Sequence, residues 1–436
     1  MSDAQTIADQ YRVRSDEWIC IHPWSHLAIT PKGGVRLCCH TKNAPDVGNL
    51  NENTVEEIFN SESMRRVRRQ MLNNQVPKEC GKCAIIEDMN ARSPRVREHT
   101  RLYSEQIRQD YIYKTKPDGT AEYNLKYWDL RFSNVCNMAC VMCNSDWSSM
   151  WIKHSKDYIK KFDEKTIQRD PNLGYFKRQH DTLGKTKIVD EPSFQWIDEY
   201  IDQVENIYFA GGEPMIMPSH WYILEKLHSA KRFDVKVKYN SNMLKLSHQG
   251  KHALDYWCDW NYGKLAVESS IDETGERAEW IRYGTEWQTV QQNIITVRDA
   301  GVKIQPIVSV AVYNIVRLPA LLEELYDLFK HKICINLVYN PEWRLELIDR
   351  SHRLALIDPL KKLEHLIADR NQMDIVYHKL KEPQLEVTDG GMKMLLLRCA
   401  LLDTHRNKNS MQLFPELEQI NQRMGGLYEQ KRQQYE

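Results

Sequence analysis

The chain has 436 residues, of which 42% are hydrophobic, and it carries 60 basic and 60 acidic side chains. This balanced charge argues against nucleic acid as a bulk partner, and a mean hydropathy of −0.62 without a long apolar run argues against a membrane span. The first residues lack the apolar stretch of a secretory signal, so a cytoplasmic location is expected. In such a reducing compartment, eleven cysteines favour metal or redox chemistry over disulfide bonds.

The N-terminal part is predicted to form short strands and turns, followed by helices. Over residues 18–50, apolar runs are broken by proline and by paired glycines. Thr54 and Glu57 have the spacing of a capping box, which predicts the start of a helix. A polar connecting helix is expected over residues 86–112. Five of the clustered cysteines lie in this part of the chain, namely Cys20, Cys38, Cys39, Cys80 and Cys83.

From residue 125 onward, strand patterns alternate with helical ones, which predicts an α/β fold with a parallel sheet. The expected strands are 126–133, 205–212, 234–241, 265–272, 303–312 and 333–340. Six strand–helix units are fewer than the eight of a full barrel, so a partial (β/α)6 TIM-like barrel is expected.

Three regions follow from these patterns. A small N-terminal α+β domain is expected over residues 1–112, and the partial barrel over 125–342. The barrel contains a long insertion, residues 144–200, and a helical C-terminal region occupies 343–436. The insertion and the C-terminal region are expected to form either a peptide groove or a lid.

Three cysteines lie on one short loop after the first predicted barrel strand. In a parallel α/β fold this loop is at the carboxyl end of the sheet, where such folds place their sites. Thiolates are soft ligands that suit iron–sulfur clusters. A four-iron cluster held by three cysteines keeps one iron open to a small molecule, whereas a structural site would be closed. Zinc with a distant fourth ligand is the alternative. The three cysteines are Cys136, Cys140 and Cys143.

The C-x3-C-x2-C spacing of this loop resembles that of the radical S-adenosylmethionine superfamily. In that family S-adenosylmethionine binds the open iron of a [4Fe–4S] cluster and is cleaved reductively to a 5′-deoxyadenosyl radical, which abstracts hydrogen from a substrate. The resemblance implies catalytic and metal-binding roles for the three cysteines. The family usually has an aromatic residue near the adenine, just before the third cysteine, and Met142 stands there in this chain.

Motifs at the ends of later strands extend the resemblance. The GGEP sequence at residues 211–214 looks like the family's motif for the methionine amino group, and its glycines would let backbone approach a ligand. Residues 240–242 take the place of a Thr-Asn-Gly motif. Residues 270–272 are similar to Ser-x-Asp-Gly, although Glu273 replaces the glycine. The resemblance implies cofactor binding by Met142, Gly211, Gly212, Glu213, Pro214, Asn240, Ser241, Asn242, Ser270, Asp272 and Arg282.

The N-terminal cysteines resemble a second module of the same superfamily. They follow the pattern C-x12-G-x4-C and then, after a helix, C-x2-C. This is similar to the auxiliary modules called SPASM and twitch, and implies a second [4Fe–4S] cluster held by Cys20, Cys38, Cys80 and Cys83. The C-x5-C-x3-C half of the SPASM pattern is missing after Cys83, which favours the shorter twitch form. Relatives generally carry the module after the barrel. A zinc site that includes His40 is the alternative.

The predicted function is that of a radical S-adenosylmethionine enzyme of the oxidoreductase type. A fully ligated second cluster would accept the electron left after hydrogen abstraction, which favours oxidation of a peptide or protein, with flavodoxin or ferredoxin as reductant. One alternative is a dehydrogenase or epimerase of a small molecule such as a sugar, aminocyclitol or nucleotide. An epimerase would need a thiol to return hydrogen, and Cys258, Cys334 and Cys399 are the candidates. The other alternative is a non-catalytic iron–sulfur or zinc-binding interaction protein.

Overall fold

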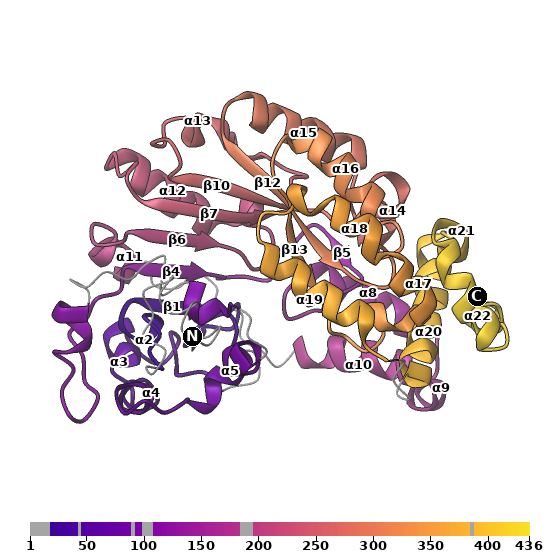
Figure 1. Ribbon diagram of the computed structural model, residues 1–436, viewed down its shortest axis with the longest axis horizontal. Coiled ribbons are helices and arrows are strands. Elements are labelled where there is room, and N and C mark those ends of the chain that lie inside the picture. The colour runs from indigo at the N-terminus through magenta and orange to yellow at the C-terminus, as the bar shows by residue number, and fades with distance from the viewer. Residues whose placement is uncertain (1–17, 42–44, 89–91, 98–107, 184–194, 384–387) are drawn as a thin grey trace.

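The computed structural model describes residues 18–41, 45–88, 92–97, 108–183, 195–383 and 388–436. Within these ranges the main sheet has nine strands in the order β13-β12-β10-β7-β6-β4-β1-β2-β3 (Figure 1). The six predicted strands pair in parallel and in chain order. They are β4 (Tyr127–Leu130), β6 (Asn206–Phe209), β7 (Lys236–Ser241), β10 (Leu265–Ser270), β12 (Lys303–Val310) and β13 (Cys334–Leu337). The predicted α/β fold with a parallel sheet is confirmed, whereas its closure into a partial barrel stays a prediction.

Helices between the strands lie along one side of the sheet (Figure 1). In β7, Val237 and Tyr239 are buried while Lys236 and Lys238 are exposed, because successive side chains of a strand point to opposite faces. Parallel sheets are usually apolar on both faces, so the polar second face is a place where a ligand can bind. The helices and short elements between these strands are α12 (Pro218–Ser229), α13 (Leu254–Trp257), α14 (Gly275–Ile281), α15 (Trp287–Asp299), α16 (Leu318–Phe329), η3 (Pro214–Ile216), β8 (Ser247–His248), β9 (Lys251–His252) and β11 (Arg282–Tyr283).

The N-terminal part joins this sheet directly, which the sequence patterns did not indicate. Strand β1 (His26–Ile29) pairs in parallel with β4, with Leu27 opposite Trp128. The predicted capping box is present, because the Glu57 amide donates to Thr54 Oγ1 at 3.2 Å and the Thr54 amide donates to Glu57 Oε2 at 3.1 Å. The other elements are α2 (His22–Ser25), β2 (Gly34–Arg36), β3 (Gly48–Asn49), α3 (Val55–Phe59), α4 (Glu62–Leu72), η1 (Lys78–Cys80), α5 (Gly81–Asp88) and η2 (Arg108–Ile112).

Residues 89–91 and 98–107 of the connecting helix predicted over 86–112 lie outside the described residues. Strand β5 (Ala139–Cys140) belongs to the cysteine loop and precedes the insertion predicted over 144–200. The described part of that insertion is mainly helical. The helices are α8 (Ser149–Ile159), α9 (Glu164–Arg169), α10 (Pro171–Leu183) and α11 (Gln195–Tyr200).

The C-terminal region is helical in its described part, and α20 contacts both α10 of the insertion and α23. Figure 1 shows these last helices beside α8 and α10, away from the N-terminal part. No helix within the described ranges is long and apolar enough to span a bilayer. The elements are η4 (Leu345–Leu347), α17 (Arg350–Ala355), α18 (Ile357–Lys362), η5 (Glu364–Leu366), α19 (Arg370–Lys381), α20 (Thr388–Arg406), α21 (Ser410–Leu413), η6 (Pro415–Leu417), α22 (Glu418–Arg423) and α23 (Leu427–Tyr435).

Candidate functional site

The three-cysteine loop is held on one side by the segment that follows α14. Strands β5 and β11 pair antiparallel, with Cys140 opposite Arg282. The Val141 amide also donates to the Ile281 carbonyl at 2.8 Å. Gly284 allows the approach, since a Cβ atom there would lie 2.6 Å from the Asn137 carbonyl oxygen. The pairing therefore brings Arg282 to the cysteine loop, although about 140 residues separate them in the chain.

On the other side, the first turn of α8 holds the loop. Ser149 Oγ accepts a hydrogen bond from the Cys136 amide at 3.2 Å. Ser148 Oγ donates to the Met138 carbonyl at 2.6 Å, and Trp151 Nε1 donates to the Cys140 carbonyl at 3.0 Å. Sequence reasoning did not single out these side chains as parts of the site, and their position directly after the loop was the only signal for them. Together they fix the loop backbone from which the thiols project.

The three thiols of the loop lie close enough together to influence one another. Burial raises the pKa of Cys136 to about 12, and the neighbouring Cys140 and Glu213 add to the effect. Burial also raises the pKa of Cys143, with further contributions from Cys140 and Cys136. Arg282 opposes this trend at Cys140, where its Nη1 donates to Sγ at 3.8 Å. The structure thus brings the three predicted ligands together beside a cation that favours the thiolate form.

The two glycines of GGEP allow β6 to pass very close to the chain that enters the cysteine loop. A Cβ atom on Gly212 would lie 2.0 Å from the Val135 carbonyl oxygen, and Gly211 has a φ of +107°. The Glu213 amide donates to the same Val135 carbonyl at 2.8 Å. The prediction assigned this conformational freedom to ligand approach. In the structure the neighbouring backbone, one residue before Cys136, already makes use of it.

Glu213 joins the GGEP motif to the end of β7. Its carboxylate accepts hydrogen bonds from Ser241 Oγ at 2.8 Å, from the Asn242 amide at 2.8 Å and from the Met215 amide at 3.2 Å. The side chain is 1% exposed, and burial raises its pKa to about 7 even though these bonds oppose the shift. Within the described residues no cation lies at ion-pair distance from it. An ammonium group is the kind of ligand that would let this carboxylate ionise.

A cavity of about 220 Å³ lies beside the loop and is lined in part by Asn242, Ser270 and Arg282. Asn242 Nδ2 donates to Asn137 Oδ1 of the loop at 2.7 Å. Three buried polar atoms in this area have no hydrogen-bond partner, and unsatisfied atoms of this kind favour a bound ligand. They are Asn137 Nδ2, Asn240 Oδ1 and Arg282 Nε. One cavity is therefore lined by Asn242 just after β7, by Ser270 at the end of β10 and by Arg282 of β11.

Arg282, Glu273 and Met142 each have a different environment. Arg282 forms an ion pair with the buried Asp272 at 2.8 Å, so its charge is already shared within the protein. Glu273, which departs from the family pattern, is fully buried between Arg277 at 3.1 Å and Arg317 at 3.0 Å, and this gives it a structural role. Met142 is half-buried against the hydrophobic core. Its predicted contact with adenine stays a prediction.

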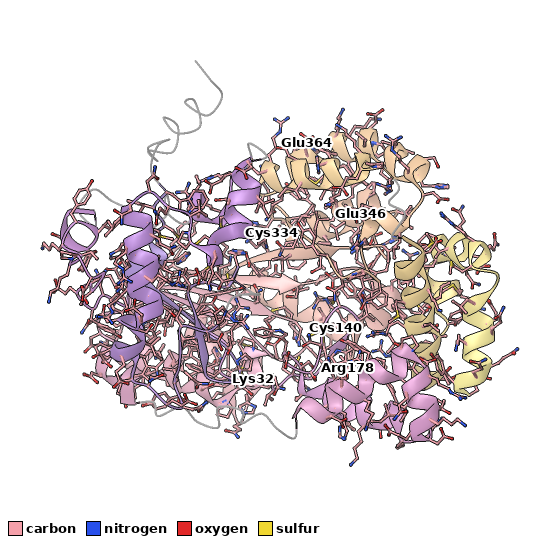
Figure 2. All side chains as sticks on the ribbon, turned by 90° about the horizontal axis from the view of Figure 1, so that it is seen from below. Lys32, Cys140, Arg178, Cys334, Glu346 and Glu364 are labelled. Atoms are coloured by element: carbon pink, nitrogen blue, oxygen red, sulfur yellow. The ribbon has the colours of Figure 1, made fainter. Side chains whose placement is uncertain are left out.

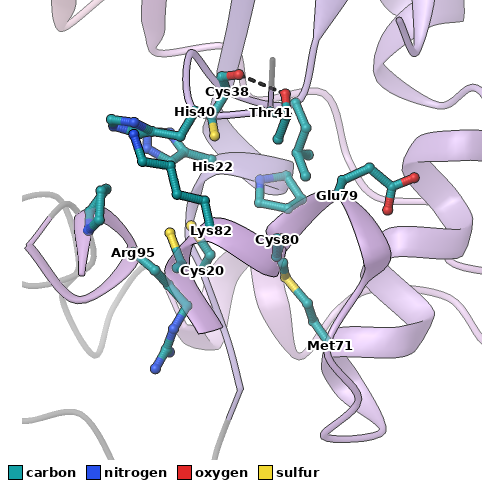
Figure 3. Close-up of a pocket in the computed structure, with 14 residues that line it drawn as sticks. Cys20, His22, Cys38, His40, Thr41, Met71, Glu79, Cys80, Lys82 and Arg95 are labelled. Carbon is teal, nitrogen blue, oxygen red and sulfur yellow. Dashed lines mark hydrogen bonds between the residues drawn. The ribbon is translucent and has the colours of Figure 1, made fainter. Parts of the chain in front are cut away.

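The four N-terminal cysteines also meet at one place. Cys20, Cys38, Cys80 and Cys83 line a cavity with about 450 Å³ of empty space. Figure 3 shows three of them around this cavity, together with His22 and His40. Burial raises the pKa of the Cys38, Cys80 and Cys83 thiols, and neighbouring thiols add to the shifts of Cys38 and Cys80. Among the described residues, no group of three or more His, Cys, Asp or Glu side chains has the arrangement of a site for a single metal ion.

Comparison with known proteins gives one family match, and no curated protein matches the chain. Residues 20–84 match SPASM, an iron–sulfur cluster-binding domain. Among solved structures, SuiB of Streptococcus suis bound to S-adenosylmethionine is 12% identical over 66% of this chain and 58% of its own, with a TM-score of 0.38. The protein anSMEcpe with bound AdoMet is 15% identical over 52% and 55%, with a TM-score of 0.35. The chain thus spans less than two thirds of either protein, and TM-scores this low do not by themselves establish a common fold.

The family match covers all four cysteines of the N-terminal cavity and confirms the iron–sulfur module predicted there. The cysteine loop and the strand-end motifs supply the second part of the predicted pattern, and the structure packs them against one another. Residues 20–84 therefore form a SPASM iron–sulfur cluster-binding domain, and the rest of the chain carries motifs that resemble those of the radical S-adenosylmethionine superfamily.

Proposed function

We propose that this protein is an enzyme that cleaves S-adenosylmethionine reductively and uses the product to oxidise a peptide or protein. The observation that carries the proposal is the convergence at one loop of three thiols, an arginine and a buried carboxylate. These groups come from Cys136, Cys140, Cys143, Arg282 and Glu213. When bound, the cluster and S-adenosylmethionine would supply the 5′-deoxyadenosyl radical that abstracts a substrate hydrogen atom.

The chain's own residues hold and orient these groups. The thiols of Cys136, Cys140 and Cys143 would hold the cluster. Glu213, whose pKa burial raises to about 7, would accept from the methionine ammonium and would be ionised by that contact. Asn242 and Ser270 offer hydrogen bonds from the wall of the adjoining cavity. Arg282, already paired with Asp272, balances thiolate charge.

The N-terminal module is proposed to hold a second cluster on Cys20, Cys38, Cys80 and Cys83, which accepts the electron left on the substrate. Two observations support its closeness to the catalytic loop. Strand β1 of the module extends the sheet beside β4, and Lys32 Nζ lies 2.7 Å from Asp146 Oδ1, three residues after the loop. We infer that the module precedes a partial barrel in this chain and docks on its first strand.

The substrate is proposed to bind the polar face of the sheet. Lys238 Nζ lies 2.7 Å from Glu268 Oε1, and Gln305 Nε2 donates to the same oxygen at 3.1 Å. The Lys238 side chain is 47% exposed although it stands in a central strand, so this face is open to solvent. Asn240, one of the proposed cofactor residues, is two residues further along β7. A substrate on this face therefore lies next to the reactive site.

One observation favours epimerisation as a second candidate function. Gln305 Nε2 lies 3.4 Å from Cys334 Sγ on β13, so this thiol belongs to the polar face. Figure 2 shows Cys334 and Cys140 toward the middle of the molecule. The other two candidate thiols are less suitable, since Cys258 is exposed at the end of α13 and Cys399 is buried within α20. A thiol on the substrate face can return a hydrogen atom to a substrate radical.

The test is anaerobic incubation of the reconstituted protein with S-adenosylmethionine and dithionite. We expect 5′-deoxyadenosine from the wild type and none from Cys136→Ala, Cys140→Ala or Cys143→Ala. Once a substrate is found, Cys334→Ala separates the two outcomes, with Cys258→Ala as its control. If the reaction is an oxidation, the Cys334→Ala variant should still form the product. If it is an epimerisation, the variant should no longer form the epimer that carries a hydrogen atom from solvent.

A further inference from the structure

Arg406, the last residue of α20, reaches the cysteine loop from the C-terminal region. Its Nη2 donates to the Ala139 carbonyl at 3.1 Å, and its Nη1 donates to the Trp280 carbonyl of α14 at 3.0 Å. The guanidinium lies 4.4 Å from the centre of the Tyr283 ring in β11. One side chain therefore contacts both strands of the β5–β11 pair that positions the cysteines.

Among the described residues, Arg406 has no counter-ion. The residue is 7% exposed. Within the described residues no carboxylate lies at ion-pair distance from it, and its Nε has no hydrogen-bond partner. A buried guanidinium without an anion is strongly unfavourable. The other arginine at the loop, Arg282, shares its charge with Asp272. Arg406 therefore places beside the loop a positive charge that no described side chain pairs at ion-pair distance, the buried Asp403 of the same helix being bonded instead to Trp280, Ser410 and Tyr428.

The source of negative charge next to Arg406 is the loop that carries the three cysteines. Ala139, whose carbonyl accepts from Arg406, directly precedes Cys140, and Arg282 Nη1 lies 3.8 Å from Cys140 Sγ. Three thiolates around a cluster are a concentrated negative charge, and adding an electron increases that charge. Nearby positive charge and hydrogen bonds are among the factors that set the potential of an iron–sulfur cluster.

We propose that Arg406 is a positioning residue that supplies the counter-charge for the cluster on Cys136, Cys140 and Cys143 and raises its reduction potential. The proposal rests on the proposed function. It makes α20 a part of the catalytic unit, in place of the groove or lid expected for the C-terminal region. The geometry also explains why a buried arginine without a carboxylate lies next to the loop.

The test compares Arg406→Gln with the charge-conserving Arg406→Lys by redox titration of the cluster signal in electron paramagnetic resonance, without S-adenosylmethionine. At a fixed potential we expect an about tenfold lower ratio of reduced to oxidised cluster in Arg406→Gln, which is about 59 mV for one electron. Arg406→Lys should stay close to the wild type. Arg398→Gln is the matched control, because Arg398 is also buried on α20 but contacts Tyr175 and Phe176 of α10.

An unchanged potential in iron-replete Arg406→Gln overturns the proposal. If the Arg406→Gln variant holds no cluster, the cluster content of Arg406→Lys shows whether the charge or the shape of the side chain is required. A full cluster in the lysine variant supports the charge role, and an empty one shows that the shape of arginine is what matters. A wild-type protein without a cluster at the loop would overturn the proposed function and this inference together, whereas an intact wild-type cluster isolates the role of Arg406.

Discussion

Replacing Gly212 by alanine should disturb the cysteine loop without touching a ligand. The new Cβ atom would lie 2.0 Å from the Val135 carbonyl oxygen, whereas ordinary van der Waals contacts begin at 3.4 Å. Both groups are backbone, so the two chain segments must separate by about 1 Å or more. Val135 directly precedes Cys136, and the separation therefore displaces the first ligand.

The magnitude follows from the contacts that are strained or lost. Overpacking of this kind costs about 1–3 kcal/mol. The separation also weakens two backbone hydrogen bonds, from Gly212 to Ser133 at 3.1 Å and from Glu213 to Val135 at 2.8 Å. Each is worth about 1 kcal/mol. We expect Gly212→Ala to lower the free energy of unfolding by about 2–5 kcal/mol and to lower the iron content of the loop.

The assay is urea denaturation of the metal-free protein, together with iron per chain after reconstitution. Gly81→Ala is the matched control because Gly81 also adjoins a cluster motif, but a Cβ atom there meets nothing within 4 Å. It begins α5, so alanine should be neutral or stabilising by up to about 1 kcal/mol. Gly212→Ala with the urea midpoint and iron content of the wild type would refute the reasoning.

Three further predictions concern charge and protons at the same site. Asp272→Asn leaves Arg282 without its buried partner and should destabilise the protein by about 3–5 kcal/mol in urea denaturation; a loss below about 1 kcal/mol contradicts this. Because burial raises the pKa of Glu213 from 4.5 to about 7, this group contributes stability below about pH 4.5, and the contribution is lost as the pH rises through about 7. Between about pH 5 and pH 8, the free energy of unfolding from urea denaturation should therefore change by about 3 kcal/mol less in Glu213→Gln than in the wild type. Parallel plots of this free energy against pH for the two proteins would argue against the prediction. Since burial also raises the pKa of Cys136, iron uptake must release protons, and timed reconstitution should load more iron at about pH 8.5 than at about pH 6.5; equal loading is the contrary result.

Local patterns were sufficient to predict much of this molecule. The six parallel strands follow from the alternation of strand and helix signals, and the Thr54 capping box from residue spacing. The cysteine loop and the GGEP motif are compact in sequence, so their spacing carries the chemistry directly. The structure then adds that each motif is packed against its neighbour, as at Gly212 and Val135.

Other features depend on contacts between distant segments and left no local signal. The pairing of β1 with β4 joins segments about 100 residues apart. Arg406 contacts Ala139 across 267 positions, and nothing around Arg406 distinguishes it from the other basic residues of a helix. Glu273 looked like a loss of the family pattern, but its burial between Arg277 and Arg317 shows a local ion-pair network instead. These roles depend on packing between distant segments, which the periodicity of hydrophobic residues along the sequence does not indicate.

The central claim is that the two sets of cysteines have different tasks, and paired variants test it most directly. Iron content and 5′-deoxyadenosine are measured for Cys140→Ala and Cys80→Ala after identical anaerobic reconstitution with S-adenosylmethionine and dithionite. We predict that Cys140→Ala keeps about four irons and makes no 5′-deoxyadenosine, while Cys80→Ala keeps the loop cluster and still makes it. A wild-type protein that holds about eight irons and forms no 5′-deoxyadenosine would contradict the account.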